Sequence, residues 1–148
     1  MSFSHLTIYL LLILLYINGI NHRPDLLIVN SNNEVKALIE IKSSMGFCRD
    51  ASNVLNEILY KDKEFKTNKH LTCMFSNDIT REVIYKSDVR LYLISFTSKN
   101  CSKDKHNLNK ELANKLGIKH YLLFSNWYHS LEEEDILYFI DDITTHLK

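Results

Sequence analysis

The apolar residues of the chain are grouped in short runs that polar turns separate, and the clearest pair of runs predicts a β-hairpin. Leu26–Val29 and Val35–Ile41 are the two runs, and the residues between them, 30–33, read Asn-Ser-Asn-Asn. Asn tolerates the left-handed backbone conformation that tight hairpin turns require. We therefore expect the last two of these residues, Asn32 and Asn33, to form a two-residue loop.

This register brings three charged residues together at the end of the hairpin. Asp25 lies directly opposite Glu40, and Lys42 shares the face of Glu40 because side chains alternate along a strand. Directly opposed Cβ atoms are about 5 Å apart, so two carboxylates there repel each other unless a cation lies between them. A divalent metal ion would be such a cation. The alternative is a surface hairpin with a salt-bridged triad, and the strictly apolar runs beside these charges count against it.

After the hairpin, helical and extended patterns alternate along the chain. Apolar residues at helical spacing predict a helix that begins at an Asp50 cap. A second helix ends near Leu116 with Gly117 as its carboxyl cap, and a third begins at a capping box of Ser130 and Glu133. The residues expected to be buried are Ala51, Val54, Leu55, Ile58 and Leu59 in the first helix, Leu108, Leu112 and Leu116 in the second, and Leu137, Ile140, Ile143 and Leu147 in the third.

Three buried strands and one further short helix complete the prediction. The strands are Leu71–Phe75, Val89–Thr97 and Ile118–Ser125, and the short helix lies near Ile79–Tyr85. Strands that alternate with helices indicate an α/β fold whose sheet is covered on both faces. Since no internal repeat or domain boundary is visible, the pattern predicts a single domain over residues 1–148.

The first twenty residues hold a separate apolar run, Leu6–Ile17, which is unbroken over residues 10–15. A transmembrane helix needs about 20 apolar residues, and a signal peptide needs a basic amino-terminal region. We therefore expect a core element, with a buried helix capped by Asn18-Gly19 favoured over a buried strand. A membrane or export segment is the alternative.

The composition is that of an ordinary globular protein. Of the 148 residues, 45% are hydrophobic and 24% are charged, and 18 basic residues balance 18 acidic ones. No overall field therefore attracts the chain to nucleic acid. A local basic surface would be needed, and the best candidates for phosphate contacts are Lys61, Lys63, Lys66 and Lys69, together with the loop 99–105. Three widely spaced cysteines form no metal-ligand pattern and fit reduced thiols in a cytoplasmic protein.

The charged residues of the hairpin carry a family resemblance. Pro24-Asp25, followed by Glu40-Ile41-Lys42 at the end of the next apolar run, resembles the motif of the PD-(D/E)XK nuclease superfamily. The segment Arg23–Ser44 is especially similar to the nuclease domains of restriction enzymes. The same E-x-K spacing occurs at Glu34-Val35-Lys36 and Glu64-Phe65-Lys66, but only Glu40 ends a buried-looking strand opposite an acid.

The resemblance implies a restriction-endonuclease-like fold, which is a mixed central sheet flanked by helices, and a metal-dependent nuclease with DNA as the expected substrate. Asp25, Glu40 and the backbone carbonyl of Ile41 would bind Mg²⁺ or Mn²⁺. Lys42 would orient or deprotonate the attacking water and offset phosphate charge. The implied partners are nucleic acid and either a second copy of the chain or a larger restriction or repair complex, and no membrane is expected.

One departure from the family pattern leaves other functions open. Many members supply another acid from a first helix, whereas residues 1–24 contain no Asp or Glu. A catalytically degenerate member that binds nucleic acid or protein without cutting is therefore the first alternative. A membrane-associated α/β protein anchored by residues 6–17 is the second.

Overall fold

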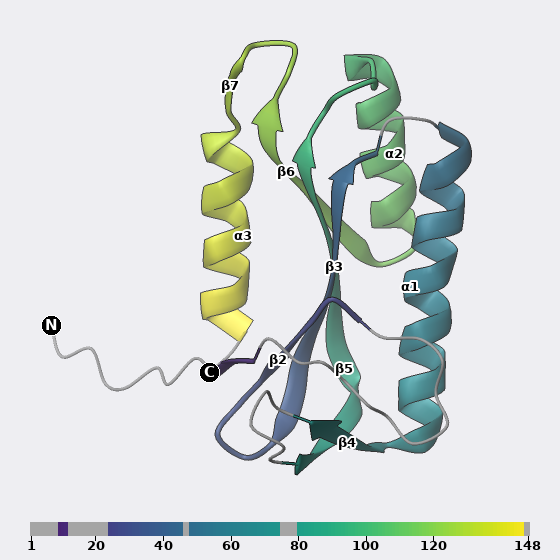
Figure 1. Cartoon of the computed structure of the whole chain (residues 1–148), viewed down its shortest axis with the longest axis vertical. Coiled ribbons are helices and arrows are strands. Elements are labelled where there is room, and N and C mark those ends of the chain that lie inside the picture. Colours follow the sequence, from purple (N-terminus) through teal and green to yellow (C-terminus); the bar gives the residue numbers. More distant parts are fainter. Residues whose placement is uncertain (1–8, 12–23, 46–47, 75–79, 147–148) are drawn as a thin grey trace, which may run out of the picture.

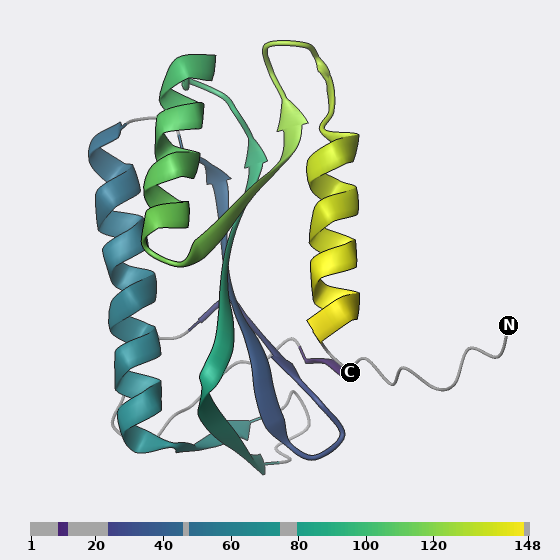
Figure 2. The ribbon, with the colours of Figure 1, turned by 180° about the vertical axis from the view of Figure 1, so that it is seen from behind.

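The protein has an α/β fold in which helices cover both faces of one mixed sheet (Figure 1). Helices α1 (Cys48–Asn68) and α2 (Lys103–Lys115) lie on one face, and α3 (Glu133–His146) lies on the other, as the view from behind also shows (Figure 2). The α/β class predicted from the sequence is therefore confirmed. The computed structural model describes residues 9–11, 24–45, 48–74 and 80–146.

Three long strands form the centre of the sheet. β3 (Glu34–Ser44), β5 (Thr80–Thr97) and β6 (Ile118–Ser125) run parallel to one another, because α1 and α2 return the chain to the same end of the sheet. β2 (Leu26–Val29) forms an antiparallel hairpin with β3. The shorter strands add at the margins: β1 (Tyr9–Leu11) beside β2, β4 (His70–Met74) beside β5 and β7 (Ser130–Leu131) beside β6.

Alternation along the central strands divides the core into two layers. Leu38 faces α1 and packs in the larger cluster, whereas the next residue, Ile39, faces the opposite side and packs near α3. Both are almost completely buried. Burying one such side chain stabilises the fold by roughly 2 kcal/mol. Glu40 and Lys42 therefore project to the same side as Leu38, toward α1.

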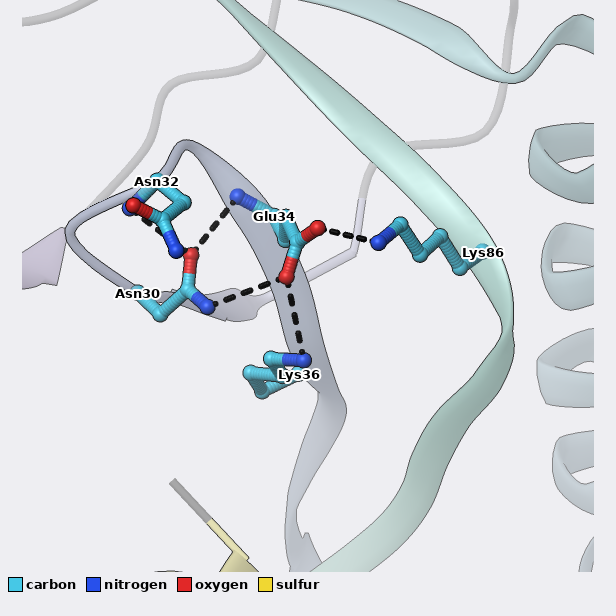
Figure 3. A network of polar contacts seen from close by, with 5 residues as sticks. All are labelled: Asn30, Asn32, Glu34, Lys36 and Lys86. Atoms are coloured by element: carbon cyan, nitrogen blue, oxygen red, sulfur yellow. Dashed lines mark hydrogen bonds and ion pairs between the residues drawn. The ribbon is translucent and has the colours of Figure 1, made fainter. Parts of the chain in front are cut away.

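The turn of the hairpin is one residue longer than predicted. The N–H of Asn30 donates to the carbonyl of Glu34 at 2.9 Å, so the loop consists of residues 31–33. Asn33 has a φ of 60°, which confirms the expected left-handed Asn. The side-chain oxygen of Asn30 accepts hydrogen bonds from the backbone N–H groups of Asn32 and Glu34, which closes the loop (Figure 3). The predicted two-residue loop is wrong because this side chain stabilises a three-residue turn.

A bulge in β3 restores the predicted register farther from the turn. Val29 pairs with Val35, but Leu26 pairs with Ile39, and the register shifts by one residue beside Lys36. The extra residue in the loop and the extra residue in the bulge cancel each other. The next position along the hairpin is that of Asp25 and Glu40, as the sequence predicts.

The segment near Ile79–Tyr85 is not the predicted short helix. Thr80–Tyr85 is the first part of β5, which pairs with β4. Val83 and Tyr85 are buried, whereas Ile84 between them is only partly buried and Glu82 before them is exposed, which is the alternation of a strand. A run this short fits a helix and a strand equally well in the sequence, and pairing with β4 decides for the strand.

Helix α1 agrees with the prediction, whereas α2 turns a different face to the sheet. Helix α1 begins at Cys48, ahead of the predicted Asp50 cap. Of its predicted buried residues, the helix fully buries Ala51, Leu55 and Ile58. In α2 the predicted buried stripe is at the surface, and the helix buries three other residues. The exposed fractions are 61% for Leu108, 36% for Leu112 and 36% for Leu116, and the buried residues are His106, Asn109 and Ala113.

The predicted buried stripe of α3 is also wrong in part. Leu137 and Ile140 are 65% and 51% exposed, and Ile143 is half-buried. Ser130 lies in β7 and therefore does not cap the helix, which begins at Glu133. The physical reason is that α3 packs on the sheet through Phe139 and Ile143, and no other described helix lies on this face to cover its remaining apolar residues. Leu147 lies outside the described residues.

Most of the amino-terminal apolar run lies outside the described residues. Of the residues 1–20, the structure describes Tyr9–Leu11, which forms β1 and pairs antiparallel with β2. For these three residues the strand alternative is correct and the favoured helix is wrong. The described part of the chain contains no helix that is long and apolar enough to span a membrane.

Candidate functional site

Asp25 lies at the start of β2 and reaches across to β3. Its Oδ2 accepts a hydrogen bond of 2.7 Å from the backbone N–H of Ile41. Because β2 begins at Leu26, this carboxylate takes the place of the strand that would otherwise pair with Ile41. The N–H and C=O of one strand residue point to the same side, so the carbonyl of Ile41 also faces the side on which Asp25 lies. The structure therefore brings these two predicted oxygen donors to one edge of the hairpin.

Glu40 is the buried centre of the candidate site, with 3% of its surface exposed. One carboxylate oxygen, Oε1, lies 3.1 Å from Nζ of Lys42, and the other, Oε2, lies 2.9 Å from Nζ of Lys61. A buried carboxylate is costly unless opposite charges and hydrogen bonds compensate it, and here both oxygens have an ammonium partner. The repulsion expected between Asp25 and Glu40 is therefore offset within the protein itself.

Lys61 belongs to the site, although its sequence position predicted a different location. We expected it on an exposed face of α1 as a phosphate contact, but it is 2% exposed and its Nζ contacts Glu40. That expectation is therefore wrong. Lys61 follows Ile58 by three residues and precedes Phe65 by four, so it continues the buried stripe of α1. This spacing is the signal in the sequence that could have identified it.

Glu57 adds a further acid from the same helix. Its Oε1 lies 3.4 Å from Nζ of Lys61, one helical turn away, and the side chain is about half exposed. The site thus contains three carboxylates and two ammonium groups from β2, β3 and α1. Glu57 was not predicted as a site residue, because the additional acid of the family pattern is expected before the hairpin rather than after it.

Lys42 keeps its positive charge in this environment. Partial burial alone would lower the pKa of Lys42, but the hydrogen bond to Glu40 and the negative charges of Glu40, Glu57 and Asp25 outweigh burial and raise the pKa above its usual value. The ammonium is therefore protonated at neutral pH. This favours a role for Lys42 as a fixed positive charge over a role as a general base.

The oxygen donors fit a hard divalent cation in kind. Mg²⁺ prefers one or two carboxylates and retains several waters, which Asp25, Glu40 and the Ile41 carbonyl could accommodate. In the described ranges, no three Asp, Glu, His or Cys side chains form a group placed to hold a metal ion. The donor set is thus two carboxylates and one carbonyl. Each oxygen of Glu40 already has an ammonium partner, so a cation would compete with Lys42 at one oxygen and with Lys61 at the other.

The remaining candidates for phosphate contacts lie farther along α1, just after it, and in the segment 99–105, where Lys99 is exposed and Lys103 and Lys105 belong to α2 rather than to a loop. Lys63 and Lys69 are exposed, and Lys66 forms an ion pair of 2.7 Å with Asp62. Lys66 and Lys69 also line a cavity of about 730 Å³ together with Lys86. Lys63 and Lys66, in the carboxyl-terminal part of α1, and Lys69, just after the helix, therefore stay accessible beyond Lys61.

The competing E-x-K motif at the hairpin turn has an evident structural role. Glu34 contacts Lys36 at 3.3 Å, and its other oxygen contacts Lys86 of β5 (Figure 3). Hydrogen bonds to Lys86 first, and to Asn30 and Lys36 next, lower the pKa of Glu34 to about 2. These residues fix the turn and do not approach Asp25.

A second polar cluster, between the sheet and α2, was not predicted from the sequence. Oγ of Ser95 lies 2.8 Å from Nε2 of His120, and the His106 ring lies 5.2 Å from the His120 ring. Burial, followed by the charges of His106 and Lys110, lowers the pKa of His120 to about 3, so the imidazole is neutral. Ser95 is 1% exposed and cannot meet a substrate. This cluster is therefore structural, although Ser95 is the register partner of Lys42.

The fold and the site together define an α/β protein with a charged cluster between a β-hairpin and the helix that follows it. No family model, curated protein or solved structure matches this chain.

Proposed function

We propose that the protein is a metal-dependent nuclease of the PD-(D/E)XK type that hydrolyses phosphodiester bonds, with DNA as the expected substrate. The observation that carries the proposal is the hairpin register. In this register Asp25 accepts a hydrogen bond from Ile41, the residue after Glu40, and Lys42 projects to the same face as Glu40. These residue types in this arrangement are those that hydrolysis of a phosphodiester requires.

Each residue of the hairpin has a distinct part in this proposal. Asp25, Glu40 and the Ile41 carbonyl would hold the ion, and a bound Mg²⁺ supplies activation of water and neutralisation of phosphate charge. The Lys42 ammonium is placed to offset negative charge that develops on the phosphate oxygens. Its raised pKa supports this electrostatic role.

Substrate contacts are proposed along the carboxyl-terminal half of α1. Lys63 and Lys69 are exposed, and Lys66 lies between them with Asp62 as its acidic partner. Phosphate contacts of this kind add affinity without sequence preference. Replacing these three lysines should weaken binding to all sequences alike and reduce its dependence on salt.

A second candidate function is a catalytically degenerate module that binds nucleic acid or protein without cutting. The observation that favours it is the engagement of both Glu40 oxygens by Lys42 and Lys61. A carboxylate that is fully satisfied inside the protein has less to gain from a metal ion. If the degenerate module binds nucleic acid, the two candidates predict the same binding but opposite results for cleavage.

The deciding experiment is a cleavage assay of the purified protein on single- and double-stranded DNA and RNA with Mg²⁺, Mn²⁺ or EDTA. The nuclease proposal expects cleavage with a divalent ion, no cleavage in EDTA, and loss of cleavage in Asp25→Asn and Glu40→Gln. A folded Lys36→Ala protein, altered in the competing E-x-K motif, should cleave normally. Failure to cut any substrate with any of these ions, while nucleic acid is still bound, would establish the degenerate module instead.

A further inference from the structure

One edge of the central sheet is open over four residues. β6 pairs with β5 along one side, whereas on the other side β7 pairs only with Phe124 and Ser125. The Asp135 carboxylate accepts the backbone N–H of Leu122 at 2.9 Å and so covers that position. Among the residues that the structure describes, no strand pairs with 118–121 on this side. An open edge of this kind is a template for another strand.

A groove follows this open edge. It has a volume of about 520 Å³ and lies between β6 and α2. Its β6 side is formed by residues 118–121, which include His120. His120 is 3% exposed, and its Nδ1 has no hydrogen-bond partner among the described residues. The groove therefore offers open backbone groups along its floor and one unsatisfied buried nitrogen.

The wall that α2 contributes to the groove is self-complementary. Asn107, Lys110, Glu111 and Asn114 line it, and their spacing is the same when read in either direction. If two copies of α2 meet in antiparallel orientation, Lys110 of each copy lies beside Glu111 of the other. Asn107 of each copy then lies beside Asn114 of the other. Glu111 is exposed and forms no ion pair with the described residues, so its charge is available for such a contact.

We propose that this edge binds a second copy of the chain, with β6 against β6 and α2 against α2 about a two-fold axis. Such an interface is isologous, since the same patch is used by both subunits. Antiparallel pairing of the two β6 edges would continue the sheet across the dimer. It would also bring the two α2 helices to the distance of about 8–10 Å at which helices pack.

One axis can serve both pairs of elements. The midpoint between Lys110 and Glu111 lies about 8 Å along α2 from Leu116, where the helix ends. The same length along β6, counted forward from Ile118 at the start of the strand, reaches the neighbourhood of His120, which is inside the open stretch. The centre of the self-complementary face of α2 and the centre of the open edge of β6 therefore lie at the same position along the two elements, so one two-fold axis can pass through both. This proposal is independent of the hydrolysis proposed above.

The mass of the full chain in solution tests the proposal. One copy has a mass of 17.4 kDa, so light scattering after size exclusion and sedimentation equilibrium should report twice this value as concentration rises. Glu111→Lys places Lys110 beside a lysine of the other copy and should raise the dimer dissociation constant at least about tenfold. Asp88→Lys, an exposed acid on β5 far from the groove, is the matched control and should dimerise as the original chain does.

Mixing two charge variants makes the test specific for this pairing. Lys110→Glu and Glu111→Lys should each dimerise poorly alone, but each brings the charge that the other lacks. Their mixture should form a heterodimer with the original affinity. Because Lys110 also contacts Asp135 at 2.7 Å, circular dichroism must first establish that Lys110→Glu is folded. If it is not, dimerisation should weaken in steps from the original chain through Glu111→Gln to Glu111→Lys.

Three results would overturn the proposal. The first is a chain that stays monomeric at every concentration. This includes the case in which β6 binds an unrelated extended peptide instead of a second copy. The second is a Glu111→Lys variant that dimerises as tightly as the original chain. The third is a pair of folded charge variants that fail to associate with each other.

Discussion

Nζ of Lys61 lies 2.9 Å from Oε2 of Glu40, and both side chains are almost completely buried. This ion pair joins the middle of α1 to the middle of β3. Lys42 approaches the other oxygen of the same carboxylate from the solvent side. The candidate site therefore contains its own cations, and any external cation must compete with them for Glu40.

Replacing Glu40 with Gln should destabilise the protein in the absence of metal. The change leaves Lys61 buried without its main counter-charge, and breaking a buried ion pair on one side typically costs about 3 kcal/mol or more. Thermal and urea unfolding measure this loss. If repulsion between Asp25 and Glu40 were the main effect, Glu40→Gln would instead raise the free energy of unfolding, because it removes one of the two negative charges.

The matched control for this substitution is Glu34→Gln. Glu34 also contacts two lysines, but its partner Lys86 is about half exposed, and solvent screens such pairs. We expect a much smaller loss of stability than for Glu40→Gln. Equal losses for the two variants would mean that burial of the Glu40 pair has no energetic consequence.

Replacing Lys61 with Met should strengthen the response to a divalent ion. Met fills a similar volume but leaves Glu40 with one ammonium partner, so the metal-free protein should unfold at a lower temperature. Metal binding would then relieve a larger excess of negative charge, and the rise in melting temperature with Mg²⁺ or Mn²⁺ should exceed that of the original chain. At metal about a hundredfold above Kd the stabilisation from binding is about 2.7 kcal/mol.

Lys63→Met is the control for this prediction, because Lys63 lies on the same helix but is exposed. It should change neither the melting temperature nor the metal response. If Lys61→Met unfolds at a lower temperature and gains nothing from metal, Lys61 does not compete with the ion and its role is structural only.

The sequence predicts the site end of the hairpin better than the turn that produces it. The loop is one residue longer than predicted because the Asn30 side chain accepts two backbone N–H groups, and the bulge beside Lys36 removes the offset. The alternation of side chains along β3 determines which residues face α1. A register shifted by one residue would turn Glu40, and every other side chain of the strand, to the opposite face of the sheet. The pattern therefore predicts the register even where the turn chemistry is misjudged.

Tertiary packing explains what the sequence does not predict. Leu108 and Leu137 sit at helical spacing with other apolar residues, yet both are exposed because α2 and α3 each meet the sheet on another side. Lys61 shows the opposite error, because a lysine is expected at the surface but this one is buried. Its burial could be predicted only if the buried carboxylate of Glu40 were known to lie beside it. Neither outcome follows from local spacing, because the position of a partner element decides both.

Stability should fall as the pH is lowered below about 6.5, in part because of His120. Burial first, and the charge of His106 next, lower the pKa of His120 in the folded protein to about 3, whereas in the unfolded chain it has its usual value near 6.5. The unfolded state therefore binds the proton first. The stabilisation is complete above about pH 6.5 and is lost progressively as the pH falls toward 3, by about 1.4 kcal/mol per pH unit for one group.

Urea unfolding at pH 7 and pH 5 checks this contribution. His120→Asn removes the titrating group, so the difference in unfolding free energy between the two pH values should be smaller than in the original chain by about 2 kcal/mol. His129→Asn, at an exposed turn position, is the control and should leave the difference unchanged. An identical pH dependence in all three proteins would show that the pKa of His120 is not lowered in the folded state.

Lys42 separates catalysis from metal binding in the proposed nuclease. Its ammonium lies 3.1 Å from Glu40 and stays protonated, so it cannot ligate a metal ion, and its proposed work is to stabilise charge on the phosphate. Lys42→Ala should therefore reduce the cleavage rate by at least about a hundredfold. The rise in melting temperature with metal should survive or increase, because a positive charge beside the ion has been removed.

Lys36→Ala tests whether the correct E-x-K motif has been identified. Lys36 contacts Glu34 at the hairpin turn, and its loss should leave cleavage and metal response as they are in the original chain. A Lys36→Ala protein without activity, beside an active Lys42→Ala protein, would place the catalytic lysine at the turn. Loss of the metal response together with cleavage in Lys42→Ala would instead mean that Lys42 is needed to form the site, because an ammonium that only stabilises phosphate charge acts after the ion is bound.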